Sequence, residues 1–172
     1  MIDNIVKLLQ DADPVNRELG FNIAVIQGIG FLNQCIAACG GRLNMSWTTI
    51  SELPKGLKVS YSLDLRGCTS LLSLPEGLSV GSWLDLYDCA SLQSLPKGLS
   101  VGDWLDLSNC TALQLLPEGI TVGGSISLSG CTALQSLPEG FSVGGSLYLN
   151  GCTSLKISKI ATIKGVAGRI IT

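Results

Sequence analysis

The chain has 172 residues, a formal net charge of −2 and no histidine. Its length suits one domain with a buried core. The lack of histidine excludes Ser-His-Asp and Cys-His catalysis and most catalytic zinc sites. The low charge argues against nucleic-acid binding through phosphate neutralisation. We therefore expect a protein that is not an enzyme and that has no cofactor or metal site.

Residues 1–41 are predicted to form a helical N-terminal cap. Asp13 and Pro14 suit the N-cap and the first turn of a helix. The segment Leu19–Gly41 carries no charge and is long enough to cross a bilayer. Its asparagine and glutamine side chains are costly in lipid, so two buried helices broken at Gly28–Gly30 are predicted instead of a membrane span. No secretory signal is visible, which favours the cytoplasm and reduced cysteines.

Five copies of a 21-residue pattern follow without insertion, and they begin at Leu53, Leu74, Leu95, Leu116 and Leu137. Each copy contains a Leu-x-Leu-type run, whose two apolar residues point inward because strand side chains alternate. One short strand per copy predicts a parallel sheet. No copy has room for a two-turn helix, and its Pro and Gly favour an extended or 3₁₀-like return on the opposite side.

The repeat resembles the leucine-rich repeat family. The match is the run L-x-L-x-x-C-x-x-L followed by x-x-L-P, as in Leu84, Leu86, Cys89, Leu92 and Leu95. It covers roughly residues 43–155 and looks like bacterial short-repeat proteins and the cysteine-type repeats of plant immune receptors. The resemblance implies a leucine-rich repeat solenoid shaped as a short horseshoe or arc. Its parallel β-sheet would line the concave side, and its convex side would be extended or 3₁₀.

Two features depart from the commonest pattern of that family. Cysteine replaces the usual asparagine, which is a known variant. A small residue also fills the first leucine position of the conserved segment in every copy: Ser60, Gly81, Gly102, Gly123 and Gly144. We expect the preceding valine of each copy to fill the resulting gap.

Residues 42–158 are assigned to the repeats, and residues 159–172 to a C-terminal cap. The repeats comprise the five copies and a degenerate first repeat within Gly40–Pro54, which lacks one residue and has Trp47 near the cysteine position. Caps are needed because a solenoid repeat cannot bury its faces alone. The C-terminal segment is basic and apolar, and its sequence is compatible with a strand or with an irregular cap.

The repeated cysteines are predicted to form a buried structural ladder, made of Cys68, Cys89, Cys110, Cys131 and Cys152. In this position cysteine acts as a small hydrophobe and a weak donor to backbone carbonyls. Parallel side chains about 4.8 Å apart suit a disulfide poorly. Cys35 and Cys39 lie one helical turn apart; without histidine or a second pair nearby, core packing is preferred to metal binding.

The outward side chains of the predicted sheet are the candidate partner-binding residues on the concave face: Asp64, Arg66, Trp83, Asp85, Tyr87, Trp104, Asp106 and Tyr148. Trp83 and Trp104 are predicted to stack side by side on adjacent strands. The aspartates are predicted to form a ladder beside them that attracts a cation. A second interpretation is that the tryptophans only cover each other and the aspartates only keep the face soluble.

The family resemblance implies a non-catalytic scaffold for protein interactions, and the acidic face favours a basic protein or peptide as partner. The alternative function is a self-associating structural unit that forms an oligomer or filament. Solenoid ends stack unless they are capped, and the basic C-terminal segment suits a head-to-tail contact with the acidic repeats.

Overall fold

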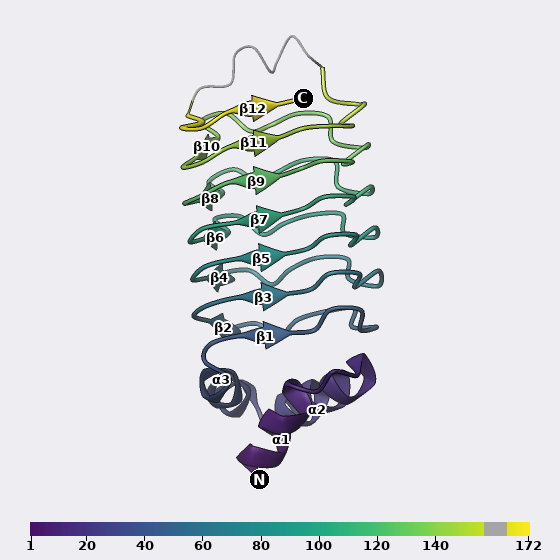
Figure 1. Cartoon of the computed structure of the whole chain (residues 1–172), viewed down its shortest axis with the longest axis vertical. Helices are drawn as coiled ribbons and strands as arrows, with labels where there is room; N and C mark the ends of the chain where they lie inside the picture. Colours follow the sequence, from purple (N-terminus) through teal and green to yellow (C-terminus); the bar gives the residue numbers. More distant parts are fainter. Residues whose placement is uncertain (157–164) are drawn as a thin grey trace.

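The computed structural model describes residues 1–156 and 165–172. They form a solenoid of stacked coils with parallel strands, preceded by three helices (Figure 1). The helices are α1 (Ile2–Leu9), α2 (Pro14–Ile26) and α3 (Ile29–Ala38). They cover the N-terminal end of the stack, and the last strand lies at the other end.

The helical segment begins and breaks where the sequence predicts. Asp13 is the N-cap of α2, and its carboxylate accepts a hydrogen bond of 2.9 Å from the Val15 N–H. Between α2 and α3, Gly28 has a φ of 102°, a conformation that side chains rarely allow. The predicted break is therefore confirmed at Gly28, whereas Gly30 lies within α3. Among the helices of the described residues, none is long and apolar enough to span a membrane.

The larger sheet, here called sheet A, has seven parallel strands that follow one another along the stack. They are β1 (Leu43–Asn44), β3 (Leu63–Asp64), β5 (Leu84–Asp85), β7 (Leu105–Asp106), β9 (Ile126–Ser127), β11 (Leu147–Tyr148) and β12 (Ile170–Ile171). The first residue of each strand from β3 to β11 is buried, and the second points outward. Strands β3 to β11 pair exactly one repeat apart, so equivalent residues of the copies lie side by side.

The return side carries a second parallel sheet, sheet B, that the sequence analysis did not predict. Its strands are β2 (Lys58–Val59), β4 (Ser79–Val80), β6 (Ser100–Val101), β8 (Thr121–Val122) and β10 (Ser142–Val143). Each ends in a buried valine, which confirms that this valine fills the gap beside the small residue. The return side combines both predicted conformations: it is extended in sheet B, and before it a turn is closed by a 3₁₀-type hydrogen bond, as from the Leu78 N–H to the Pro75 carbonyl at 3.3 Å. The described residues contain no 3₁₀ helix.

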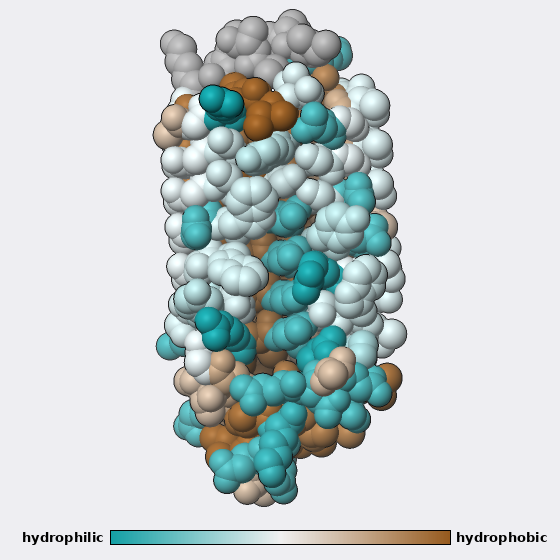
Figure 2. Space-filling view, viewed as in Figure 1, coloured by the Kyte–Doolittle hydropathy of each residue, from teal (hydrophilic) through white to brown (hydrophobic). Residues whose placement is uncertain are grey.

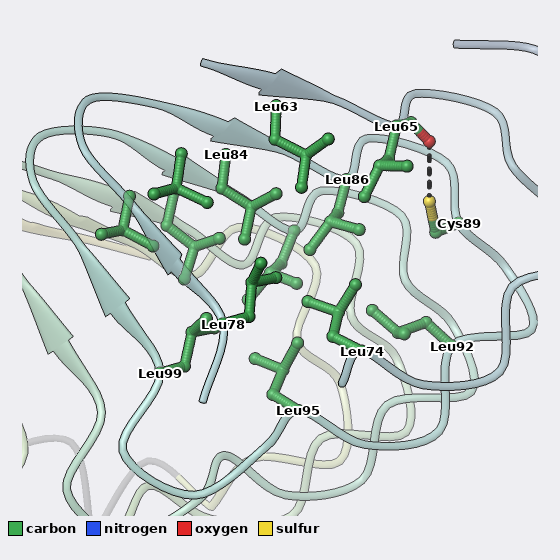
Figure 3. Close-up of a cluster of buried hydrophobic side chains, with 14 of the residues drawn as sticks. Leu63, Leu65, Leu74, Leu78, Leu84, Leu86, Cys89, Leu92, Leu95 and Leu99 are labelled. Atoms are coloured by element: carbon green, nitrogen blue, oxygen red, sulfur yellow. Dashed lines mark hydrogen bonds between the residues drawn. The ribbon is translucent and has the colours of Figure 1, made fainter. Parts of the chain in front are cut away.

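The core is a set of leucine ladders between the two sides of the coil. Leu63 and Leu84 point inward from sheet A, and Leu78 and Leu99 face them from the return side (Figure 3). All four are at least 98% buried. Full burial of one such side chain contributes about 1.5–3 kcal/mol, so each added coil extends a continuous core.

The described part of the C-terminal segment forms a strand. β12 pairs in parallel with β11, and Val166 bridges to Val143 of sheet B. Residues 165–172 thus continue both sheets by one further coil. The predicted boundary between residues 158 and 159, and the first part of the predicted cap up to residue 164, lie outside the described residues.

Candidate functional site

The predicted binding residues lie on the outward surface of sheet A, here called the sheet-A face. Asp64, Asp85 and Asp106 occupy the second residues of β3, β5 and β7 and are in register. Hydrophilic side chains form a column along part of this face; a narrow hydrophobic strip borders it on one side, and paler residues lie further out on both sides (Figure 2). The predicted aspartate ladder is therefore present.

Each aspartate ends its strand through a local hydrogen bond. The Oδ1 atoms of Asp64, Asp85 and Asp106 accept the backbone N–H two residues later, at 3.2, 3.0 and 2.8 Å. Asn44 does the same for Ser46 at 2.9 Å. Short acceptors stabilise turns in this way. The aspartates thus have a structural role that one carboxylate oxygen of each fulfils.

Arg66 lies beside the first two aspartates of the ladder. Its Nε and Nη2 atoms donate to the two carboxylate oxygens of Asp64 at 3.0 and 2.7 Å, and Nε lies 3.5 Å from Oδ2 of Asp85. The hydrogen bond to Asp64 raises the pKa of Arg66. Asp106 has no ion pair within the part of the chain that the structure describes.

Asp85 lies in the middle of the ladder, and the negative charge of its carboxylate is electrostatically unfavourable there. Burial raises the pKa of its carboxyl group, and the charges of Asp106 and Asp64 add to this. The Tyr87 N–H and the Arg66 guanidinium act in the opposite direction and do not compensate fully. A further cation beside Asp85 and Asp106 would relieve this repulsion.

The prediction that Trp83 and Trp104 stack on each other is wrong. Trp83 packs edge-on against Tyr61, with ring centroids 6.5 Å apart. Trp104 instead packs against Tyr148 at 5.8 Å, across the intervening strand β9. This reach is possible because the outward residue of β9 is the small, buried Ser127. The aromatic residues therefore form two separate pairs.

Three residues of this region were not predicted. The Arg42 guanidinium lies 4.3 Å from the ring centroid of Tyr61, a cation–π contact. Trp47 is 56% exposed and its ring lies over Gly67 of the next coil. Buried Thr48, not Trp47, takes the cysteine position of the first repeat, where its hydroxyl donates to the Met45 carbonyl at 2.6 Å. The sequence signal for this position is that Thr48 follows Leu43 by the same five residues that separate Cys68 from Leu63; the residue that the first repeat lacks falls after Thr48.

Four cysteines of the ladder are fully buried inside the solenoid, and the fifth, Cys152, is half-buried. Each Sγ donates to a carbonyl of the preceding coil at 3.0–3.3 Å; the acceptors are Met45, Leu65, Leu86, Leu107 and Leu128 (one such bond is dashed in Figure 3). Burial raises the pKa of every ladder thiol, to about 12 for Cys89 and Cys131. These thiols are therefore poor nucleophiles and serve the scaffold.

Cys35 is buried and Cys39 half-buried at the end of α3, and both are free thiols whose pKa burial raises. Residues 1–156 and 165–172 contain no group of three cysteine, aspartate or glutamate side chains suited to a metal ion. Comparisons with protein-family models, with curated proteins and with solved structures find no match. Function is therefore inferred from the sheet-A face.

Proposed function

We propose that this protein is a non-catalytic interaction scaffold of the leucine-rich repeat type that binds a basic protein or peptide through the sheet-A face. The observation that supports this proposal most directly is the aspartate ladder next to exposed aromatic rings. Asp85 and Asp106 lie in register, and Trp83 and Tyr87, which are 45% and 40% exposed, belong to the same coil as Asp85.

The energetics of this surface suit binding. Exposed Trp and Tyr are enriched at interfaces, where they supply large contact areas with little conformational entropy to lose. A cation over such a ring contributes about 0.5–2 kcal/mol, and more when the contact is desolvated. The half-buried ladder charges gain from a basic partner, which supports the proposed charge of the ligand.

The cysteine ladder supports the leucine-rich repeat type within this proposal. Its thiols occupy the position where the family usually has asparagine, and both side chains can donate from the interior to backbone carbonyls. The offset between cysteine and acceptor is 24 residues in the four later copies, as in Cys89 and Cys110, and 23 for Cys68, and this regularity fits a backbone-capping role. Horseshoe curvature with sheet A on the concave side is the expected consequence.

A titration with defined peptides tests the proposal. Decapeptides of basic, acidic and neutral composition are titrated against the protein by calorimetry. The basic peptide should bind, and replacing Trp83 and Trp104 together by Ala should weaken its binding at least tenfold. The control is Leu115→Ala, which removes a side chain of 54% exposure that lies outside sheet A. Equal binding of all three peptides contradicts the proposal.

Self-association is the second candidate function. The observation that favours it is an exposed apolar stripe on one face of α2, made of Val15, Leu19 and Ile26. A second copy of the chain is the occupant that this candidate requires. Sedimentation across a concentration series tests it: Leu19→Glu should convert a concentration-dependent oligomer into a monomer, and a wild type that stays monomeric eliminates this candidate.

A further inference from the structure

We infer that the Asp85–Asp106 pair of the sheet-A face is a docking point for one arginine side chain of an extended peptide. This inference rests on the proposed binding function and specifies its recognition element. It commits to a peptide as the source of the guanidinium group. Four observations support it: the repeat symmetry of the ladder, the position of Arg66, the stacking of Arg42, and the charge of the pair.

The first observation is that the protein already holds a guanidinium group in the equivalent place one coil earlier. Arg66 donates to Asp64 at 2.7 and 3.0 Å and lies 3.5 Å from Asp85. The Asp64–Asp85 and Asp85–Asp106 pairs have the same register on neighbouring strands. The second pair therefore presents the same arrangement of carboxylates as the first.

The second pair lacks a cation of its own. The residue equivalent to Arg66 in the next coil is Tyr87, which carries no positive charge at neutral pH. In the described residues Asp106 has no ion pair, and Asp85 has only its 3.5 Å approach to Arg66. The guanidinium of Arg66 therefore neutralises the carboxylates of Asp85 and Asp106 only in part, because it pairs mainly with Asp64. This makes binding of an external cation at the second pair electrostatically favourable.

The aromatic residues beside the pair suit a planar cation. At the N-terminal end of the same face, Arg42 lies 4.3 Å from the Tyr61 ring centroid. The face thus holds its own arginines in two ways, by stacking on a ring and by pairing with carboxylates. Trp83 and Tyr87 are 45% and 40% exposed and belong to the same coil as Asp85, so this coil presents both aromatic rings and a carboxylate to a partner.

The geometry favours arginine over lysine. A guanidinium group has five donors in a planar fork and can pair with two carboxylates while its plane stacks on a ring. Arg66 uses two of its nitrogens on Asp64 in this manner. A lysine ammonium is a compact, strongly hydrated charge without a flat face. Side-chain shape, and not net charge alone, is therefore expected to determine affinity.

Two peptides that differ in one residue test this inference. Each is a nine-residue Gly/Ser peptide with blocked ends and a central Arg or Lys, titrated into the full chain while the Trp83 and Trp104 indole N–H signals are followed by NMR. The arginine peptide should bind at least about tenfold more tightly, which corresponds to about 1.4 kcal/mol. Equal affinities overturn the inference.

Variants locate the site. Asp106→Asn should weaken arginine-peptide binding about tenfold while it keeps the turn, because Asn44 already accepts the equivalent N–H. Asp3→Asn on α1 is the control with the same change in net charge. Unchanged binding in Asp106→Asn overturns the assignment.

Repeat symmetry provides a test in the opposite direction. Tyr87→Arg should supply an internal guanidinium to the second pair, as Arg66 does to the first, and should abolish binding of the arginine peptide. Tyr87→Phe is its control and should retain binding. Arg66→Met empties the first pair and should let the protein bind a second equivalent of the peptide. Retained binding in Tyr87→Arg contradicts the inference.

The outcomes separate this inference from the proposed function. If the basic decapeptide binds at the sheet-A face but the arginine and lysine peptides bind equally, the interaction function stands and the arginine inference fails. If no basic peptide binds, both fail.

Discussion

The α-carbon of Gly102 lies directly against the carbonyl oxygen of Gly81 in the preceding coil. A Cβ at position 102 would overlap that oxygen, and the same holds for Gly123 over Gly102 and for Gly144 over Gly123. These glycines form the corner between sheet B and sheet A, where backbones stack without side chains between them. Close approach, not backbone conformation, is the reason for glycine at this departure from the commonest repeat pattern.

Gly102→Ala should therefore lower the free energy of unfolding by about 1–3 kcal/mol, the usual range for overpacking of a rigid site. Chemical denaturation followed by circular dichroism measures the change. Gly30→Ala is the matched control, because nothing lies within 4 Å of a Cβ there and alanine favours helix α3. If both variants are equally stable, the backbones at positions 81 and 102 are not packed closely enough to exclude a Cβ, and the explanation is wrong.

The buried ladder thiols should resist alkylation in the native protein. With the pKa of Cys89 and Cys131 raised to about 12, about one thiol in 10⁴ is ionised at pH 8, and these side chains are fully buried. Iodoacetamide labelling with mass mapping should modify half-buried Cys39 and Cys152 first, and the buried ladder cysteines at the rate of unfolding. Simultaneous labelling of Cys39 and Cys89 in folded protein contradicts this expectation.

Asp85 should make stability depend on pH. Its pKa is raised in the folded state, so the folded protein favours the protonated carboxyl. This contribution is present at low pH and is lost as the pH rises through the folded-state pKa. The unfolding free energy of the wild type relative to Asp85→Asn should therefore fall between pH 3 and pH 7. Denaturation of both proteins across this range measures it, and an opposite slope is incompatible with the burial of Asp85.

The sequence predicted those features that depend on the repeat period. Strand alternation placed Leu84 inside and Asp85 outside, and the 21-residue spacing aligned the cysteine and aspartate ladders. The period also determines which residues are neighbours in the stack, so the stacked parallel coils followed from it. Sheet B was not predicted, although Leu78, Ser79 and Val80 alternate between buried and exposed, because the Pro and Gly that precede such a run predict only an extended or 3₁₀-like return.

The repeat period did not predict which side chains contact each other across several coils. Trp104 pairs with Tyr148 because Ser127 leaves room above β9, a contact that spans two repeats. Trp47 is exposed because it takes the position that Gly67 has in the next coil, where its ring lies over that glycine, while Thr48 takes the buried cysteine position. Both features depend on packing between copies that differ from one another.

Arg17 connects the helical cap to the first coil. It is 96% buried, and its Nη2 donates to the Ser46 carbonyl at 2.6 Å while Nη1 donates to the carbonyls of Asp11 and Ala12 at 2.9 and 2.8 Å. One planar group thus joins the α1–α2 turn to the residues after β1. A lysine nitrogen cannot reach both sides at once, so Arg17→Lys leaves buried carbonyls without a donor.

We expect Arg17→Lys to destabilise the protein by about 1.5–3 kcal/mol, the range for losing a hydrogen bond to a charged group. Because each coil contacts only its neighbours, the loss should be local. Hydrogen exchange should therefore accelerate in α1, α2 and β1 and remain slow in β5 to β9. Arg169→Lys, an exposed position at the far end, is the control. Uniform acceleration along the whole solenoid would contradict this prediction, because it would mean that the cap and the coils unfold as one cooperative unit.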